Sequence, residues 1–343
     1  MQKTLIIGFG RAGRGLHWHC LRRAYADDVT GQLFNQTVGV VDPKADSRDR
    51  EEPNLVFFSS LNEVAGFDPD HTVVHICTPP ELHEAMLSEA AEHGYTRIIM
   101  EKPLTTTMTQ LDRIRLIQER YAIDLLVVAN WLSSTLTERL HALIQSGVYG
   151  PLRHIKAEQD KPRLSRTIAN PSHENAFDVE IPHLAALALF LGGTEIEVVS
   201  AESADMRIDG RIFPHMGRAR MSMLHHRRLT SELHSNLEAP IRKRRIELYF
   251  DRHRVIGYYP SSQDDSFSWM KTYGADGRLL EEKVMYDDTL SAVFMQYYNY
   301  YDGRSSKPVS DLAFNARVVS AICQAKSLCG LMLEEDSIRE VMT

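Results

Sequence analysis

The chain has 343 residues, of which 43% are hydrophobic and 25% are charged, as in ordinary globular proteins. This length predicts about two domains and a core that is large enough to fold without disulfides. The formal net charge of −7 argues against nucleic acids and anionic membranes as partners, because both require a basic surface.

The N-terminus and the cysteines indicate the expected compartment. The opening stretch, "MQKTLIIGFG", starts a strand at once and has none of the features of a signal peptide. No apolar stretch reaches the roughly 18 residues that a membrane-spanning helix needs. The four cysteines, at positions 20, 77, 323 and 329, form no CxxC pair, which is typical of reduced thiols. We therefore expect a cytoplasmic protein.

The first third of the chain alternates apolar strands with amphipathic helices. The expected strands are Thr4–Gly8, Thr37–Asp42, Leu55–Phe58, Thr72–Thr78, Arg97–Glu101 and Leu125–Ala129. The expected helices are Ala12–Tyr25, Leu61–Ala65, Pro80–His93 and Thr107–Arg120. Strands such as "TVVHICT" are almost continuously apolar, which favours a parallel sheet that is covered on both faces. The alternation predicts an α/β fold whose residues 1–129 form a doubly wound domain.

After about residue 130 the pattern changes to long strand-like runs. These runs cover 151–159, 194–208, 218–237 and 242–259, and one apolar helix, "PHLAALALFLGG", interrupts them. The chain turns helical again near 289–301 and 311–332. Long runs without helices between them predict a large, open, mostly antiparallel sheet. We therefore expect residues 130–343 to form a second α/β domain.

A glycine-rich turn follows the first expected strand. "GFGRAG" has the GxGxxG spacing and lies between a strand and a helix, the context that a dinucleotide-binding loop requires. Gly8 suits the tight turn, Gly10 would let the backbone approach a pyrophosphate, and Gly13 would let helix and strand pack closely. The free N–H groups at the helix N-terminus would then face the anion.

The second expected strand ends in Asp42. An acidic residue here can accept hydrogen bonds from the ribose hydroxyls of NAD and would repel the 2′-phosphate of NADP. Lys44 could weaken this preference, so NAD is the expected cofactor and NADP stays possible. At the end of another strand, Thr78 and Pro79 would lie along the dinucleotide, although they also suit a helix start.

Four motifs in order resemble the Gfo/Idh/MocA family of oxidoreductases: "GFGRAG", "TPPELH", "EKPL" and "IQSGVYGPLRHIKAE". The resemblance spans roughly residues 3–193. It implies an NAD(P)-dependent dehydrogenase or reductase with an N-terminal Rossmann domain. The substrate would be a secondary alcohol or ketone of a sugar, cyclitol or sugar derivative. The C-terminal sheet would form a homodimer or homotetramer. The residues implied for cofactor binding are Gly8, Phe9, Gly10, Arg11, Ala12, Gly13, Asp42, Thr78, Pro79, His83, Glu101 and Lys102.

Two residues carry the catalysis that the resemblance implies. Lys102 matches the lysine of the EKP motif and would bind substrate and handle its proton; a solvated lysine paired with Glu101 is the alternative. His183 matches the family histidine and would act as base or proton relay, although a histidine before an apolar helix is often structural. The resemblance also implies a cis peptide bond between Lys102 and Pro103.

The segment before His183 departs from the family pattern. Val179 and Ile181 stand where the family commonly has an aspartate and a glycine, and Asp178 and Glu180 flank the first of these positions. If this segment is a loop, Asp178 could still reach the substrate. The expected substrate-binding residues are Lys102, Asn130, Trp131, Lys161, Asp178 and His183. A domain-joining role for Trp131 and a solvated loop at Lys161 remain open.

No metal site is expected. His225, His226 and His234 lie in one strand-like run, but adjacent residues point to opposite faces of a strand and no acidic or Cys partner stands at matching spacing. Two other functions remain open. One is a non-catalytic, dinucleotide-sensing or scaffold protein on the same fold, and the other is a reductase of a non-sugar small molecule.

Overall fold

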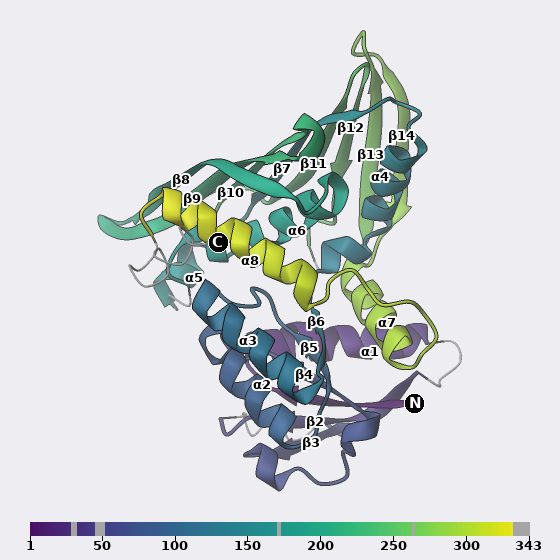
Figure 1. The fold of residues 1–343 in the computed structure, drawn as a ribbon, viewed down its shortest axis with the longest axis vertical. Helices are drawn as coiled ribbons and strands as arrows, with labels where there is room; N and C mark the ends of the chain where they lie inside the picture. Colours follow the sequence, from purple (N-terminus) through teal and green to yellow (C-terminus); the bar gives the residue numbers. More distant parts are fainter. Residues whose placement is uncertain (29–32, 45–51, 170–172, 263–264, 332–343) are drawn as a thin grey trace. The chain divides into compact units, whose positions relative to one another are not determined.

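The computed structural model describes residues 1–28, 33–44, 52–169, 173–262 and 265–331. These residues form two compact units. The first unit contains residues 1–130 and 290–316, and the second contains residues 131–289 and 317–343. The predicted α/β class is confirmed, with one parallel sheet and one large, mostly antiparallel sheet (Figure 1).

The first unit is built on a six-stranded parallel sheet of order β3-β2-β1-β4-β5-β6. Its strands are β1 (Gln2–Ile7), β2 (Phe34–Val41), β3 (Leu55–Phe58), β4 (Thr72–Ile76), β5 (Arg97–Met100) and β6 (Asp124–Val127). This order reverses direction beside β1, which is the strand order of a dinucleotide-binding Rossmann sheet. Ligands of such sheets bind at the carboxyl ends of the strands near that reversal.

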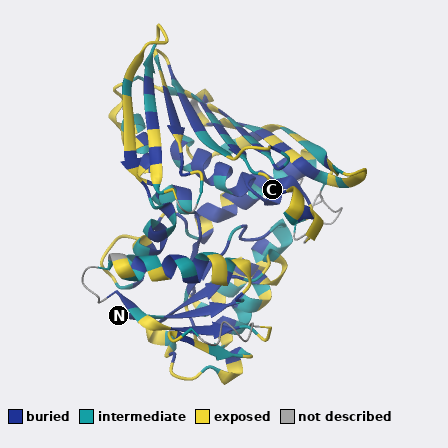
Figure 2. Cartoon of the chain, turned by 180° about the vertical axis from the view of Figure 1, so that it is seen from behind, coloured by how far each residue is buried: buried dark blue, intermediate teal, exposed yellow. Residues whose placement is uncertain are grey.

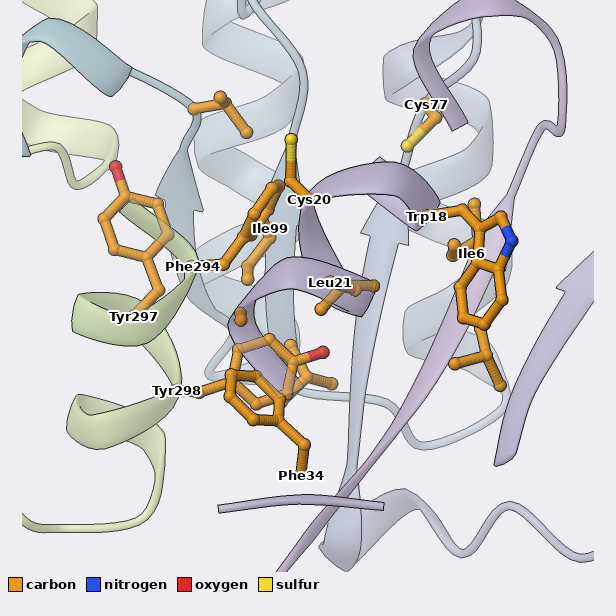
Figure 3. Close-up of a cluster of buried hydrophobic side chains, with 14 of the residues drawn as sticks. Ile6, Trp18, Cys20, Leu21, Phe34, Cys77, Ile99, Phe294, Tyr297 and Tyr298 are labelled. Atoms are coloured by element: carbon orange, nitrogen blue, oxygen red, sulfur yellow. The ribbon is translucent and has the colours of Figure 1, made fainter. Parts of the chain in front are cut away.

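The helices of this unit cover both faces of the sheet. They are α1 (His19–Asp27), α2 (His83–Glu92), α3 (Met108–Tyr121) and α7 (Thr289–Tyr301). A π-helical turn, Gly13–Trp18, precedes α1. α1 and α7 share one buried cluster with the sheet, including Leu21, Phe294 and Tyr298 (Figure 3). Figure 1 shows α2 and α3 side by side on the other face.

The segment 290–316 groups with the first unit, although the predicted domain break near residue 130 assigns it to the C-terminal part. The physical reason is the buried face of α7. Tyr297 and Tyr301 donate hydrogen bonds to backbone carbonyls of the parallel sheet, at Val127 and Ile98 respectively. These contacts join residues more than 150 positions apart, which no local pattern reveals.

The second unit contains an eight-stranded sheet of order β14-β13-β12-β11-β7-β10-β9-β8. Its strands are β7 (Leu152–Asp160), β8 (Ile196–Ile208), β9 (Arg211–His225), β10 (Thr230–Asn236), β11 (Lys243–Phe250), β12 (His253–Tyr258), β13 (Phe267–Gly274) and β14 (Leu279–Tyr286). All pairs are antiparallel except β7 with β10. Figure 2 shows buried and exposed residues alternating along several strands, as expected of a sheet with one covered face.

The first three α-helices of the second unit are α4 (Thr135–Ser146), α5 (Leu164–Ala169) and α6 (Ile181–Gly192). α8 (Leu312–Leu328) starts in the first unit and continues in the second after Ala316. α6 is apolar almost throughout and contacts β7 and β10, so it forms the core beneath the sheet.

Several sequence-based element assignments differ from the structure. The run 242–259 forms two strands, β11 and β12. The run 218–237 is not one strand, because a 3-10 turn at His226–Arg228 separates β9 from β10. The expected helix Leu61–Ala65 is only a 3-10 turn, Leu61–Glu63, after which Val64 is extended and Gly66 has a positive φ. Strands β13 and β14 were not predicted, since polar and charged residues interrupt their apolar pattern.

Candidate active site

The glycine-rich turn joins β1 to the helix that begins at Arg11. Gly8 has φ +88, a conformation that favours glycine. A Cβ at Gly13 would lie 2.1 Å from the Gly8 carbonyl oxygen, so only glycine allows this close approach of helix and strand. A Cβ at Gly10 would meet nothing within 4 Å, which leaves open space in front of the backbone. Gly8 and Gly13 therefore have the environments that the sequence analysis expected, and the approach of a pyrophosphate to Gly10 stays a prediction.

Asp42 directly follows β2 and connects its end to the glycine-rich turn. One carboxylate oxygen accepts a hydrogen bond from the Phe9 amide at 2.7 Å, and the other accepts one from the Lys44 amide at 2.8 Å. The Phe9 side chain is buried and packs edge-on against Phe57. Asp42 is thus fixed beside the turn, with lone pairs left for further donors.

Alanine at position 13 is expected to lower the free energy of unfolding by about 1–3 kcal/mol, because its Cβ would overlap the Gly8 carbonyl oxygen. Urea unfolding measures this change. Gly15→Ala is the matched control, since a Cβ there meets nothing within 4 Å and alanine is the better helix former. Equal stability of the two variants would contradict the predicted overlap.

Thr78 and His83 follow β4 at the same end of the sheet. His83 is buried, and its two ring nitrogens lie 3.0 Å from the carbonyl oxygens of Leu104 and Thr78. Burial lowers the pKa of His83, although the two carbonyls oppose this change. His83 therefore ties together two segments that follow neighbouring strands. A cofactor contact from His83 stays a prediction.

The EKP segment comes directly after β5. The peptide bond between Lys102 and Pro103 is cis, which confirms the expectation. Glu101 is only 8% exposed, and its Oε2 accepts a hydrogen bond from the Lys102 amide at 3.1 Å. Its other oxygen lies 2.8 Å from Nε2 of the buried His17. The main chain of Lys102 is therefore held by a carboxylate that is itself anchored inside the domain.

In the second unit, His183 lies in the first turn of α6 and stacks on Trp131. Their ring centroids are 5.8 Å apart with an interplanar angle of 21°. The Trp131 ring also stacks on Tyr259, with ring centroids 4.5 Å apart and an interplanar angle of 10°. Trp131 is buried, while Asn130, just before it, is half-buried. The stack fixes the plane of the His183 ring against a rigid aromatic surface.

The acidic residues before His183 are both buried and both paired. Asp178 forms an ion pair with Lys326 of α8 at 2.6 Å, and both side chains are 3% exposed. Burial raises the pKa of the Asp178 carboxyl, and Lys326 opposes this rise. Glu180 accepts hydrogen bonds from Lys161 and from Gln159. Asp178 and Lys161, both expected to bind substrate, therefore already have charged partners; their substrate contacts stay predictions.

Sequence reasoning did not find several residues around these positions. His17, His75, Tyr259 and Lys326 are the main ones. A lysine inside the apolar helix 312–328 and a histidine inside the apolar strand "TVVHICT" are the signals that could have drawn attention to two of them. For Tyr259 the sequence holds no such signal.

The histidines of the second unit do not assemble into a cluster. His225 is buried and lies near the Gly193 carbonyl and the Ser231 hydroxyl, whereas the side chain of His226 is 71% exposed. Among the described residues, no group of three or more His, Cys, Asp or Glu side chains could hold a metal ion. Within the same residues, no helix is both long and apolar enough to cross a membrane.

The turn and its surroundings fit a dinucleotide. Besides the open space at Gly10, the Thr78 hydroxyl is buried and has no hydrogen-bond partner among the described residues. A buried hydroxyl without a partner is costly, and a bound ligand would satisfy it. The strand order, the glycine-rich turn and Asp42 together define a dinucleotide-binding domain of the Rossmann type.

Comparison with known proteins gives one family match, in the N-terminal part of the chain. Residues 2–126 match the Gfo/Idh/MocA family, described as an oxidoreductase family with an NAD-binding Rossmann fold. The match covers the N-terminal part of the chain, where strands β1 to β5 of the parallel sheet lie. No curated protein matches the sequence.

Solved structures extend the likeness of fold over the whole chain. One is KijD10, a 3-ketoreductase from Actinomadura kijaniata in complex with NADP and TDP-benzene (16% identity, TM-score 0.76, covering 95% of this chain and 97% of that one). Another is the UDP-N-acetylglucosamine 3-dehydrogenase GnnA from Acidithiobacillus ferrooxidans (18%, 0.71, 95% and 97%). A third is an oxidoreductase from Agrobacterium radiobacter in complex with NAD⁺, L-tartaric acid and magnesium (15%, 0.72, 96% and 96%). At these identities the likeness is one of fold.

Proposed function

We propose that this NAD(P)-dependent oxidoreductase transfers a hydride between the nicotinamide and a secondary alcohol or ketone of a sugar, cyclitol or sugar derivative. The observation that carries the proposal is the EKP segment, where Lys102 follows β5 at the carboxyl end of the Rossmann sheet on a backbone fixed by Glu101. Two of the solved structures of similar fold are a 3-ketoreductase and a UDP-N-acetylglucosamine 3-dehydrogenase, which supports a sugar derivative as the substrate class.

The proposal gives each residue a separate task. The cofactor, when bound, accepts or gives the hydride, and the protein must orient the substrate and move a proton. Lys102 would bind the substrate oxygen and stabilise its developing negative charge. His183, held by its stack on Trp131, would take the hydroxyl proton as base or relay. Asn130 is a further proposed substrate contact.

The cofactor would be held by the first unit. The backbone of the glycine-rich turn would bind the pyrophosphate, and Thr78 Oγ1 would satisfy its hydrogen-bonding potential on the ligand. Asp42 would accept hydrogen bonds from the ribose hydroxyls, so NAD is the proposed cofactor. The fold neighbours are divided on this point, since one structure contains NADP and another NAD⁺.

The asparagine variant of Asp42 is expected to bind NADP about tenfold more tightly than the wild type, because it removes the charge that repels the 2′-phosphate. Asparagine keeps one oxygen for the Phe9 amide, so the turn retains its hydrogen bond. Isothermal titration with NAD and NADP measures both affinities. The exposed Asp70→Asn changes the net charge equally and should leave the preference unchanged. An unaltered preference in Asp42→Asn would argue against ribose recognition by Asp42.

The proposed function is tested with a panel of sugars, cyclitols, nucleotide sugars and non-sugar alcohols, together with the corresponding ketones. Each is incubated with the protein and NAD(H) or NADP(H), and the absorbance of the reduced cofactor is followed. Turnover of a polyhydroxylated member supports the proposal, and turnover of non-sugar members alone would replace its substrate class. Cofactor binding without turnover of any member would support the dinucleotide-sensing alternative.

We also propose that the protein is a cytoplasmic homodimer or homotetramer assembled through the second unit. Exposed aromatic residues on β13 and β14, namely Phe267, Trp269 and Tyr286, support a protein contact on this sheet. The free thiols of all four cysteines are in keeping with a reducing compartment. Light scattering of the purified protein would give the oligomeric state, and a monomer would contradict the assembly.

A further inference from the structure

A chain of polar side chains runs through the interior of the first unit, starting at the carboxylate beside Lys102. Glu101 Oε1 lies 2.8 Å from His17 Nε2, and His17 Nδ1 lies 2.7 Å from His75 Nδ1. His75 Nε2 lies 2.9 Å from the Tyr298 hydroxyl, which is 2.5 Å from the Thr4 hydroxyl. We call these five residues the buried chain. Each member comes from a different segment of the first unit.

The buried chain is enclosed by apolar side chains. Its members are between 0% and 8% exposed, and Glu101 is the most accessible. Phe294 of α7 contacts both imidazoles, with centroid distances of 5.0 Å to His17 and 5.4 Å to His75. Figure 3 shows Phe294 and Tyr298 within the cluster that covers this side of the sheet. An unpaired polar group here would be costly, so the hydrogen bonds along the chain stabilise its members.

Two arrangements of hydrogens keep all four hydrogen bonds between the members of the buried chain, and they differ by one proton. In the first, Thr4 donates to Tyr298, Tyr298 to His75, His75 to His17, and neutral His17 to anionic Glu101. In the second, every bond from Thr4 to His17 is reversed: His17 donates to His75, His75 to Tyr298, and Tyr298 to Thr4. The second arrangement needs one proton more, which lies between His17 and Glu101. The chain can therefore take up one proton without losing a hydrogen bond.

The extra proton belongs at the outer end of the chain. Burial lowers the pKa of His75 well below its ordinary value, and His17 lowers it further, so His75 stays neutral. Burial raises the pKa of Tyr298, so its hydroxyl keeps its proton. Besides Lys102, titratable groups that interact with the chain include Tyr25 on α1, Cys77 after β4, and His83 on α2. Burial favours the neutral form of each, so they add no competing charge.

We propose that His17 and His75 are positioning residues for Lys102, and that the buried chain takes up one proton from solvent directly behind it. The link is the hydrogen bond from the Lys102 amide to Glu101 Oε2. Without the proton the His17–Glu101 pair carries one negative charge, and with it the pair is neutral. The electrostatic field at Lys102 therefore changes with the state of the chain. The inference rests on the proposed function only in giving Lys102 its catalytic importance.

The test uses nuclear magnetic resonance of the whole protein with 15N-labelled histidines, without substrate or cofactor. We expect a scalar coupling across the hydrogen bond between Nδ1 of His17 and Nδ1 of His75, since one of the two nitrogens donates to the other. As the pH is varied, the 15N chemical shifts of the ring nitrogens of both histidines should change with one common midpoint pH. The Lys102 amide resonance should change at that same midpoint, because its acceptor is the Glu101 carboxylate.

The variant Tyr298→Phe should move this midpoint to lower pH, by about one unit or more. When the chain holds the extra proton, His75 donates its Nε2–H to the Tyr298 hydroxyl, and the variant has no such acceptor. Without the extra proton His75 has no N–H at this position, so the substitution makes proton uptake harder. Tyr297→Phe is the matched control. That hydroxyl is also buried on α7, but it donates to the Val127 carbonyl and lies outside the chain. A purely structural effect would alter both variants alike.

Absence of the coupling in the wild type would overturn the inference, and so would equal midpoints in Tyr298→Phe and Tyr297→Phe. The wild-type coupling and the Lys102 amide titration require no variant, so a misfolded Tyr298→Phe would not prevent a decision. None of these readouts involves turnover. A failure of the buried chain is therefore distinguishable from a failure of the proposed activity, which the substrate panel tests.

Discussion

Replacing Lys102 by methionine is expected to lower turnover by about two to four orders of magnitude while NAD still binds. Methionine has a similar length but provides neither the positive charge nor the proton that the proposed reaction needs. The Lys102 amide would still donate to Glu101, since the main chain is unchanged. Turnover of the best substrate from the panel and titration with NAD measure the two effects separately.

The matched control for this prediction is Lys307→Met. Lys307 also belongs to the first unit, but it is 40% exposed and pairs with Asp124 at the surface. Exposed ion pairs contribute at most about 1 kcal/mol, so its loss should change neither turnover nor binding. Full activity of Lys102→Met would refute the catalytic assignment. Loss of NAD binding together with activity would instead assign Lys102 to cofactor binding.

Replacing Lys326 by methionine is expected to lower the free energy of unfolding by about 3–5 kcal/mol, because it leaves the Asp178 carboxylate buried without its partner. The loss should become smaller as the pH is lowered. The pKa of Asp178 is already raised by burial, and without Lys326 it would rise further, so the carboxyl would take up a proton on mild acidification. Urea unfolding at several pH values measures both effects.

Two further variants separate the buried pair from a general effect of charge. Lys326→Met combined with Asp178→Asn should recover part of the lost stability, since no charge is then buried alone. Arg115→Met breaks the exposed pair with Asp112 and should cost less than about 1 kcal/mol. A pH-independent loss in Lys326→Met, with no recovery in the double variant, would contradict the role given to the ion pair.

The ion pair also bears on the departure from the family pattern before His183. In the structure, Asp178 and Glu180 face inward toward lysines instead of remaining free in a loop. The kinetic effect of Asp178→Asn at pH 7 would show whether Asp178 contacts substrate as well. We expect Asp178→Asn to change the free energy of unfolding more than it changes turnover. The partner of Asp178 is the buried Lys326, which lies 148 positions away in the chain.

The local sequence pattern was sufficient to predict the parallel sheet and the glycine-rich turn. The apolar strands are short and uninterrupted, and the spacing of Gly8, Gly10 and Gly13 follows from the approach distances at each position. The cis bond before Pro103 was expected from the resemblance alone. The eight-stranded sheet could be predicted only as a class, because polar residues obscured β13 and β14 and no pattern indicated that β7 and β10 pair in parallel.

The sequence by itself determined which class of domain binds the dinucleotide, since that depends on the periodicity of neighbouring residues and on glycines a few positions apart. Only the tertiary structure decided what surrounds the candidate catalytic residues. It brought α7 onto the parallel sheet, His17 and His75 behind Glu101, and Lys326 onto Asp178. These contacts join distant segments through buried hydrogen bonds and charges. Their energy depends on exclusion of water, which exists only once the chain has folded.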